Sequence, residues 1–185
     1  MNYMKSILLV LFSLIICPLI GFAQKNVNGA TRVIIIRHGE KPDKGDNLSC
    51  KGFNRAIQLA DVLQKKYGIP DRIYTPSPNL GGSTSTARMY QTIIPFAIKY
   101  NLKINTKYEV KDEKELAEAI KKQTGTVLVV WEHKSITKIL KALGVEEKMD
   151  WDDNDFDSIL IVTLQNGKAQ LSKDREGINP SAECH

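Results

Sequence analysis

Two continuous apolar segments constrain the fold more strongly than any other feature of the chain. Residues 32–37 and 126–131 are rich in valine and isoleucine and lack the alternating polar positions of a half-exposed strand. Runs of this kind are typical of strands covered on both faces, as in parallel sheets flanked by helices. Helical patterns separate the two segments and follow the second one. We therefore expect a single α/β domain, with a three-layer, doubly wound and mostly parallel sheet and helices on both faces.

The other helices and strands are expected from periodicity and from residues that begin or end such elements. Apolar residues at spacings of three and four predict a helix over residues 49–67, with Phe53, Ile57, Ala60 and Leu63 on its buried side. Ser49 is its expected N-cap, and Gly68 its expected end. Further helices are predicted over residues 86–100, 112–122 and 134–143, and further strands over residues 71–75, 102–110, 158–164 and 168–171.

The N-terminal segment has the pattern of a signal peptide. Lys5 precedes an apolar run at residues 6–20, and Gly21 and Ala23 supply small residues where signal peptidase requires them. Cleavage after Ala23 is the favoured interpretation. An uncleaved membrane anchor is the alternative, although the run is short for a membrane span of roughly 20 residues.

Cleavage would divide the chain into three parts. Residues 1–23 are the expected signal peptide, residues 24–31 a polar linker, and residues 32–185 a single domain. The mature protein is then expected in the periplasm or outside the cell, without stable insertion in a membrane. The chain of 185 residues has 26 Lys and Arg against 21 Asp and Glu, a formal net charge of +5. These charges form no basic stripe, so we expect no nucleic-acid partner.

The cysteines bear on redox chemistry and on metal binding. The chain has three cysteines, and Cys17 would leave with the signal peptide. In an oxidising compartment Cys50 and Cys184 are able to form a disulfide, and two unpaired thiols are the alternative. No two cysteines have the CxxC spacing of a zinc or thiol-redox site, and no metal site is predicted.

The two internal histidines follow the two most apolar segments. His38 comes directly after residues 32–37, and His133 comes shortly after the second segment. Ligands of open α/β sheets bind beyond the carboxyl ends of the strands, so we expect both imidazoles at one site. Arg37 adjoins His38, and its guanidinium needs an anion or water at the end of a buried strand. Arg88 lies at an expected helix start with free backbone N–H groups, an arrangement suited to phosphate.

These residues occur in motifs that resemble the histidine phosphatase superfamily, which includes cofactor-dependent phosphoglycerate mutases and many small phosphatases. The tripeptide that begins at Arg37 matches its RHG signature. Residues 83–92 are similar to its Ser-x-x-x-Arg-x-x-Gln-Thr stretch, which here contains Arg88, and His133 matches its second histidine. The likeness extends over residues 32–165 and is greatest to a small exported branch.

The resemblance implies a reaction and a role for each residue. His38 would be the nucleophile that accepts the phosphoryl group, while Arg37, Arg88 and His133 would bind the phosphoryl oxygens. The implied enzyme is a phosphomonoesterase that forms a phosphohistidine intermediate on a small phosphorylated substrate. It would need no metal and no cofactor, because side chains supply the positive charges.

The identity of the proton donor stays open. Many members of the family have glycine after the second histidine, where this chain has Lys134. Glu132 is the favoured catalytic acid because it adjoins His133, although neighbours in an extended strand point to opposite faces. Glu109 is the next candidate. The site could also lack an acid, which would restrict it to substrates with good leaving groups.

Residues 150–157 form an acidic segment, a composition that calcium-binding loops also have. The glycine and the final glutamate of an EF-hand are missing from the corresponding positions, so a solvated loop is the simpler interpretation. In the alternative, Asp153 or Asp157 lines the mouth of the pocket or pairs with Arg37.

Three other functions remain open from the sequence. The least favoured is a phosphohistidine phosphatase that acts on proteins, which needs an open, shallow site. A binding module would hold a phosphorylated ligand in the same pocket with weak or no turnover. A phosphotransferase of the phosphoglycerate mutase type is less favoured, because the mature chain leaves little room for loops that enclose a bisphosphate. The sequence names no particular substrate and gives no oligomeric state.

Overall fold

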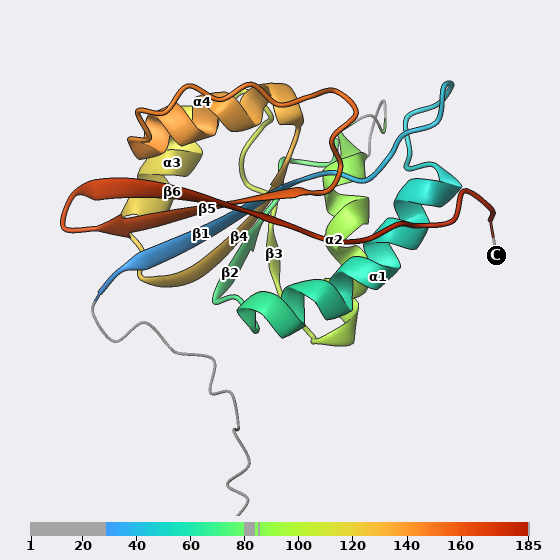
Figure 1. Cartoon of the computed structure of the whole chain (residues 1–185), viewed down its shortest axis with the longest axis horizontal. Coiled ribbons are helices and arrows are strands. Elements are labelled where there is room, and N and C mark those ends of the chain that lie inside the picture. The colour runs from blue at the N-terminus through green and yellow to red at the C-terminus, as the bar shows by residue number, and fades with distance from the viewer. Residues whose placement is uncertain (1–28, 80–83, 85, 185) are drawn as a thin grey trace, which may run out of the picture.

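The computed structural model describes residues 29–79, 84 and 86–184 of the chain (Figure 1). The predicted signal peptide at residues 1–23 and most of the predicted linker at residues 24–31 lie outside the described residues. Within the described part, no helix is long and apolar enough to cross a membrane.

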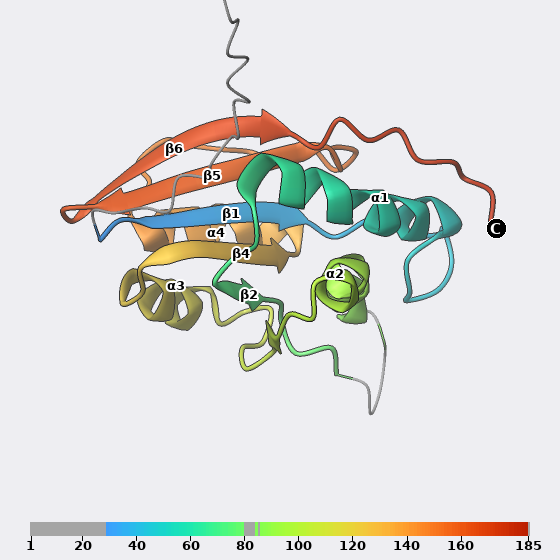
Figure 2. The ribbon, with the colours of Figure 1, turned by 90° about the horizontal axis from the view of Figure 1, so that it is seen from below.

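One mixed sheet forms the centre of the described domain. Its strands are β1 (Thr31–Arg37), β2 (Arg72–Tyr74), β3 (Ile104–Asn105), β4 (Gly125–Trp131), β5 (Ser158–Gln165) and β6 (Lys168–Arg175). They lie in the order β3-β2-β4-β1-β5-β6, and Figure 2 shows β5 and β6 together at one edge. The first four strands in this order are parallel, whereas β5 pairs antiparallel with both β1 and β6.

Helices cover both faces of this sheet. Those of the described residues are α1 (Cys50–Tyr67), α2 (Ala87–Lys99), α3 (Glu113–Lys121) and α4 (His133–Leu143). α1 and α2 pack on one face and α3 and α4 on the other, as Figure 1 shows. The predicted three-layer α/β fold with a mostly parallel sheet is therefore confirmed.

The two apolar segments of the sequence are the neighbouring central strands β1 and β4. Ile34 and Ile36 of β1 pack in the core beneath α1 and α2, while Val33 and Ile35 pack in the core beneath α3 and α4. All four side chains are at most 1% exposed. Because helices cover both faces, the central positions of the strand must be apolar, and no polar alternation remains there.

α1 begins and ends where the sequence indicates, and its predicted buried side is confirmed at Ala60 and Leu63, which are both 2% exposed. Ser49 is its N-cap, and the Ser49 hydroxyl oxygen accepts a hydrogen bond of 3.1 Å from the Gly52 N–H. The prediction that Phe53 and Ile57 are buried is wrong, since they are 52% and 49% exposed. The side facing the sheet includes Arg55 instead, because buried carboxylates neutralise its guanidinium.

The segment between α2 and α3 is mostly loop. The strand predicted over residues 102–110 is reduced to β3. The Asp112 carboxylate accepts a hydrogen bond of 2.9 Å from the Glu109 N–H, and the Asp112 N–H donates back to the Glu109 carbonyl at 3.0 Å. These two bonds fold the chain into a turn directly before α3.

The C-terminal segment is tied to the start of α1. β5 and β6 form a hairpin in which Asn166 and Gly167 have φ of 52° and 73°, as a two-residue turn requires. β6 extends to Arg175, beyond the predicted strand. The chain then runs along α1 (Figure 1), and Cys184 forms a disulfide with Cys50, their Cα atoms 5.0 Å apart. Of the two states that the sequence allowed, the structure has the disulfide.

Candidate active site

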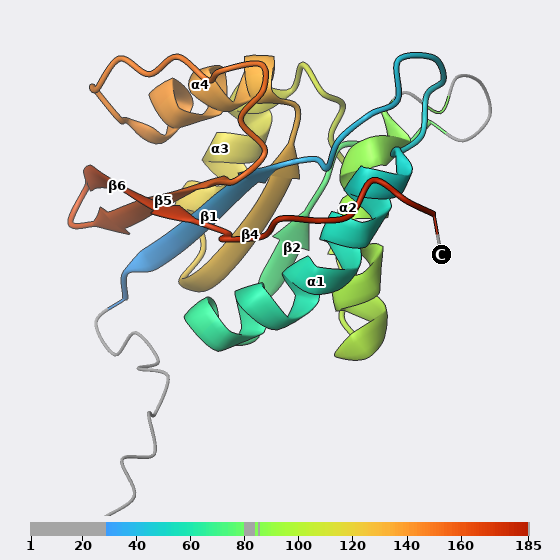
Figure 3. The ribbon, with the colours of Figure 1, turned by 45° about the vertical axis from the view of Figure 1, so that its right-hand side comes forward.

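The predicted site residues lie at the carboxyl ends of β1 and β4, on the side of the sheet where α2 and α4 begin (Figure 3). Arg37 lies beside Trp131 in the parallel pairing of the two strands, and the His38 N–H donates to the Trp131 carbonyl at 3.2 Å. His133 is the first residue of α4, and Arg88 lies in the first turn of α2. The topology therefore brings all four side chains to one edge.

His38 is buried and held as a neutral imidazole. Its Nδ1 lies 2.7 Å from the Gly39 carbonyl oxygen, which only accepts, so Nδ1 carries the proton and Nε2 keeps its lone pair. Burial lowers the pKa of His38 to about 4; the Gly39 carbonyl opposes this shift, and the positive charges of Arg37, Arg88 and His133 add to it. The imidazole is thus uncharged at neutral pH, with a lone pair on Nε2.

Gly39 is required for packing against α1. A Cβ at this position would lie 2.9 Å from the Gly52 carbonyl oxygen, closer than real contacts allow. The close approach that this glycine allows is to the backbone of α1. The Gly39 N–H also donates to the Thr92 hydroxyl at 2.9 Å, and that hydroxyl donates to the Arg88 carbonyl at 2.8 Å. These bonds connect the turn after β1 with α2.

Arg37 is buried at the end of β1. Its Nη1 donates to the carbonyl oxygens of Asp153, Asp155 and Asp152 at 2.7, 3.2 and 3.3 Å. The Phe156 ring lies over the guanidinium, 3.9 Å from ring centroid to carbon Cζ. Burial lowers the pKa of Arg37, although nearby carboxylates oppose the shift. The side chain is thereby fixed in one orientation.

The segment at residues 150–157 lies against the site, where Asp153 contacts His133, but the alternative in which a carboxylate of this segment pairs with Arg37 is wrong. Main-chain carbonyls, and not the carboxylate of Asp153 or Asp157, accept the hydrogen bonds from Arg37. Asp157 instead accepts from the Gly177 N–H at 2.8 Å and lies 3.4 Å from the Arg175 guanidinium. The simpler interpretation as a solvated loop is therefore incomplete.

His133 lies between two carboxylates. Its Nε2 is 2.6 Å from Oδ1 of Asp153, and its Nδ1 is 3.7 Å from Oε1 of Glu132. Glu132 is the N-cap residue of α4 and follows the end of β4, so the alternation of an extended strand no longer separates it from the site. The carboxylate of Glu132 is also one of the charges that act on Arg37.

Three nitrogens at the site are buried without a hydrogen-bond partner among the described residues. They are Nε of Arg37, Nε of Arg88 and Nδ1 of His133. Another nitrogen of the Arg88 guanidinium, Nη1, donates to the Asp46 carbonyl at 3.1 Å. Each of the three predicted phosphate ligands thus has one buried nitrogen without a hydrogen-bond partner among the described residues.

Glu109, the second candidate for the proton donor, lies on a cavity of about 550 Å³ between the starts of α2, α3 and α4. Thr86, two residues before Arg88, and Ser135, two residues after His133, line the same cavity. Glu109 therefore borders the edge of the sheet where the site lies.

A buried charge network behind the site was missed from the sequence. Glu40 accepts two hydrogen bonds of 2.9 Å from Nε and Nη2 of Arg55, whose Nη1 donates to Glu176 at 2.6 Å. Burial raises the pKa of Glu176 to about 7, and Arg55 opposes the shift. The position of Glu40 directly after the RHG tripeptide was the available signal, but its partners are distant in sequence.

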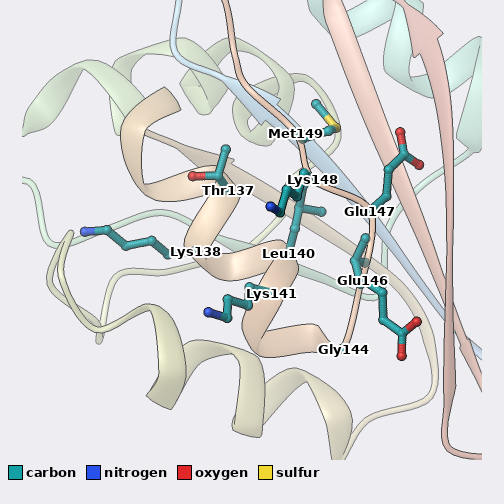
Figure 4. A pocket seen from close by; sticks show the side chains of 10 residues that line it. Thr137, Lys138, Leu140, Lys141, Gly144, Glu146, Glu147, Lys148 and Met149 are labelled. Carbon is teal, nitrogen blue, oxygen red and sulfur yellow. The ribbon is translucent and has the colours of Figure 1, made fainter.

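The cavity in Figure 4 lies away from this site. Its volume is about 770 Å³, and it is formed by the C-terminal half of α4 and the segment that follows, with Leu140, Val145 and Met149 among its lining residues. None of the predicted site residues lines it, so it has no part in the chemistry considered below.

The comparisons with known proteins establish the fold. No family model matches the sequence, and no curated protein matches it. The chain shares its fold with solved structures described as phosphatases and as a phosphoglycerate mutase. A structure from Agrobacterium tumefaciens described as the phosphohistidine phosphatase SixA is 21% identical with a TM-score of 0.55, covering 78% of this chain and 97% of that chain.

Two further structures were solved with ligands. A protein histidine phosphatase SixA in complex with tungstate is 16% identical, with a TM-score of 0.53 and coverage of 78% and 97%. A phosphoserine phosphatase variant from Entamoeba histolytica in complex with phosphoserine is 17% identical, with a TM-score of 0.55 and coverage of 80% and 97%. At these identities the likeness defines the architecture, and the chemistry must be argued from the site.

Proposed function

We propose that the protein is a phosphomonoesterase that hydrolyses phosphate esters through a phosphohistidine on His38. The observation that carries this proposal is the set of buried nitrogens on Arg37, Arg88 and His133 that lack partners among the described residues. Buried N–H groups without partners are rare and costly in folded proteins. A phosphoryl group placed against the neutral imidazole of His38 would supply oxygen acceptors to all three.

The reaction then takes two steps. The Nε2 lone pair of His38 attacks phosphorus, the bond from phosphorus to the ester oxygen breaks, and that oxygen leaves with the electron pair and takes a proton from an acid. The cationic side chains stabilise the charge on the phosphoryl oxygens in the transition state. Water next attacks the phosphohistidine and gives a proton to the carboxylate, so phosphate is released and Nε2 is restored.

Glu132 is the proposed proton donor. Its carboxylate lies on the Nδ1 side of His133, where a phosphoryl oxygen would bind, and its side chain is 29% exposed, so it can exchange protons with solvent between turnovers. Glu132→Gln should lower turnover of an alkyl phosphate far more than turnover of p-nitrophenyl phosphate, whose leaving group needs no proton. Glu109→Gln is the matched control. The opposite result would assign the donor role to Glu109.

The nucleophile is tested by trapping the intermediate. The protein is mixed with a ³²P-labelled phosphate ester, quenched in base and digested, and we expect acid-labile label on the peptide that contains His38. His38→Ala, shown by circular dichroism to be folded, should carry no label and have no turnover. Tight substrate binding without label on the wild-type protein would instead indicate a binding module, and transfer of label to a second alcohol would indicate a phosphotransferase.

The substrate and the location of the protein are also proposals. We propose a small phosphorylated substrate, and phosphoserine and phosphohistidine are reasonable first compounds in a screen because the similar structures carry those names. The proposed export after cleavage at residue 23 is supported by the Cys50–Cys184 disulfide, since such bonds persist in oxidising compartments. Metal independence is proposed because side chains supply the charges, and unchanged turnover in a chelator would test it.

A further inference from the structure

One loop holds two of the proposed phosphate ligands. We name residues 150–157 the acidic loop. Its carbonyls accept three hydrogen bonds from Arg37, its Phe156 ring covers the same guanidinium, and its Asp153 carboxylate contacts His133. Arg37 is the last residue of β1, and His133 comes shortly after the end of β4. The acidic loop contacts both side chains.

The acidic loop is itself held in place by the core and by local hydrogen bonds. Trp151 is buried among the residues beneath α4, and its indole N–H donates to the Asp155 carbonyl at 2.8 Å. The Asp155 carboxylate accepts from the backbone N–H groups of Asp157 and Ser158 at 2.9 and 3.0 Å. Burial opposes the charge of Asp155, but its hydrogen bonds from Ser158 and Asp157 hold its pKa below the usual value. The position of Asp153 is therefore set by the fold of the acidic loop.

The contact between Asp153 and His133 fixes the roles of the two ring nitrogens. Oδ1 of Asp153 lies 2.6 Å from Nε2, and an ionised carboxylate only accepts, so Nε2 carries a proton. Nδ1 is on the buried side and has no hydrogen-bond partner among the described residues, and the Glu132 carboxylate lies 3.7 Å from it. The imidazole is thus held at its exposed edge, and its inner nitrogen donates to a phosphoryl oxygen when the ring carries both protons as the imidazolium.

We propose that Asp153 is a positioning residue that holds the imidazole of His133 through Nε2 and thereby directs Nδ1 to the phosphoryl group. This inference rests on the proposed function, and it adds to that function a residue from the acidic loop. The same loop sets the orientation of Arg37 through its main chain. Asp153 itself stays at the exposed edge, where its side chain is 77% exposed, and does not touch the reacting atoms.

The alternative to a positioning role is competition, in which the Asp153 carboxylate occupies the place of the phosphate. The two roles make different predictions. A positioning residue contacts a nitrogen that the ligand does not use, whereas a competitor contacts the nitrogen that the ligand needs. The unpartnered Nδ1 favours the first, since a competing anion would be expected to satisfy it.

The direct test is nuclear magnetic resonance of the wild-type protein with ¹⁵N-labelled histidine, which is simple because the chain has three histidines. Titration with inorganic phosphate should move the Nδ1 signal of His133 while its Nε2 stays bonded to a proton. Movement of the Nε2 signal alone, or no response of His133 to saturating phosphate, would overturn the proposal. This titration needs no variant and no turnover.

Variants test the same inference by kinetics. Asp153→Asn should change the ring signals of His133 and lower kcat/KM roughly tenfold, the size expected when an exposed hydrogen bond to a charged group is lost. Asp153→Glu should restore part of the loss. Asp150→Asn is the matched control, because it removes a charge from an exposed position of the same loop and should leave both measurements unchanged.

The outcomes separate this inference from the proposed function. Tighter inhibition by inorganic phosphate in Asp153→Asn, with kcat/KM unchanged or raised, would show competition and overturn positioning. Equal loss in Asp150→Asn and Asp153→Asn would show a general charge effect and overturn it as well. Absence of a phosphohistidine on the wild-type protein would instead overturn the proposed function, whereas the phosphate titration of His133 would still report on Asp153.

Discussion

Arg55 and Glu40 form a buried, bidentate ion pair that connects the turn after β1 with α1. Two hydrogen bonds of 2.9 Å join the guanidinium of Arg55 to the two carboxylate oxygens of Glu40. The remaining nitrogen, Nη1, donates to Glu176 at 2.6 Å. Glu40 comes two residues after His38. The orientation of the proposed nucleophile therefore depends on a charge network that lies behind it.

Removal of Arg55 should be strongly destabilising. Arg55→Ala leaves the carboxylates of Glu40 and Glu176 buried without a counter-charge, a change that typically costs about 3–5 kcal/mol. Chemical denaturation with urea measures the free energy of unfolding. Lys51→Ala is the control, because Lys51 also faces Glu40, at 4.0 Å, but is half exposed. It should change the free energy by no more than about 0.5 kcal/mol, and equal effects of the two variants would contradict this view of the network.

The same network should make stability depend on pH. Burial raises the pKa of Glu176 from the ordinary 4.5 to about 7, so between these values the folded protein binds a proton that the unfolded chain does not. The stabilisation from this proton is full below pH 4.5 and is lost as the pH rises through about 7. We expect the free energy of unfolding of the wild type to fall across this window, relative to Glu176→Gln, by on the order of 1 kcal/mol or more. Parallel pH curves for the two proteins would refute the prediction.

The fold could be predicted because its signals are local. The central positions of β1 and β4 are apolar, α1 has an N-cap and a terminal glycine, and Asn166-Gly167 forms the turn of the last hairpin. The buried side of α1 could be predicted only in part in this way. Arg55 belongs to it only because Glu40 and Glu176 lie within hydrogen-bond distance, and Glu176 is 121 residues away in sequence.

The site could be predicted in part for the same reason. The ends of two apolar strands and the start of a helix located Arg37, His38, Arg88 and His133, and the topology brings them to one edge. The contacts of the acidic loop are different, because they depend on main-chain carbonyls and on a tryptophan anchored in the core. No spacing in the sequence encodes which carbonyl faces Arg37, so the sequence favoured a solvated loop and offered a carboxylate contact to Arg37 only as the alternative.

Activity should persist in mildly acidic solution. Protonation of Nε2 abolishes the nucleophile, and burial lowers the pKa of His38 to about 4, so the active neutral form remains dominant at pH 5. The acid limb of kcat/KM, which reports on the free enzyme, should therefore have its midpoint near pH 4, unless the enzyme unfolds first. Circular dichroism over the same range separates unfolding from titration. A midpoint near 6.5 in a folded protein would show that His38 is not held in this environment.

The disulfide should stabilise the domain through the C-terminal segment. Cys184 is tied to Cys50 at the first residue of α1, and the Asn54 side chain donates to the carbonyls of Ser181 and Glu183 at 3.0 and 2.8 Å. Cys184→Ser should lower the free energy of unfolding by roughly 2–4 kcal/mol, the range typical for loss of a native disulfide. Dithiothreitol should lower the Tm of the wild type to that of Cys184→Ser and leave the Tm of Cys184→Ser unchanged. A wild-type Tm that does not respond to dithiothreitol, with complete reduction confirmed by thiol labelling, would show that the segment is held by its other contacts alone.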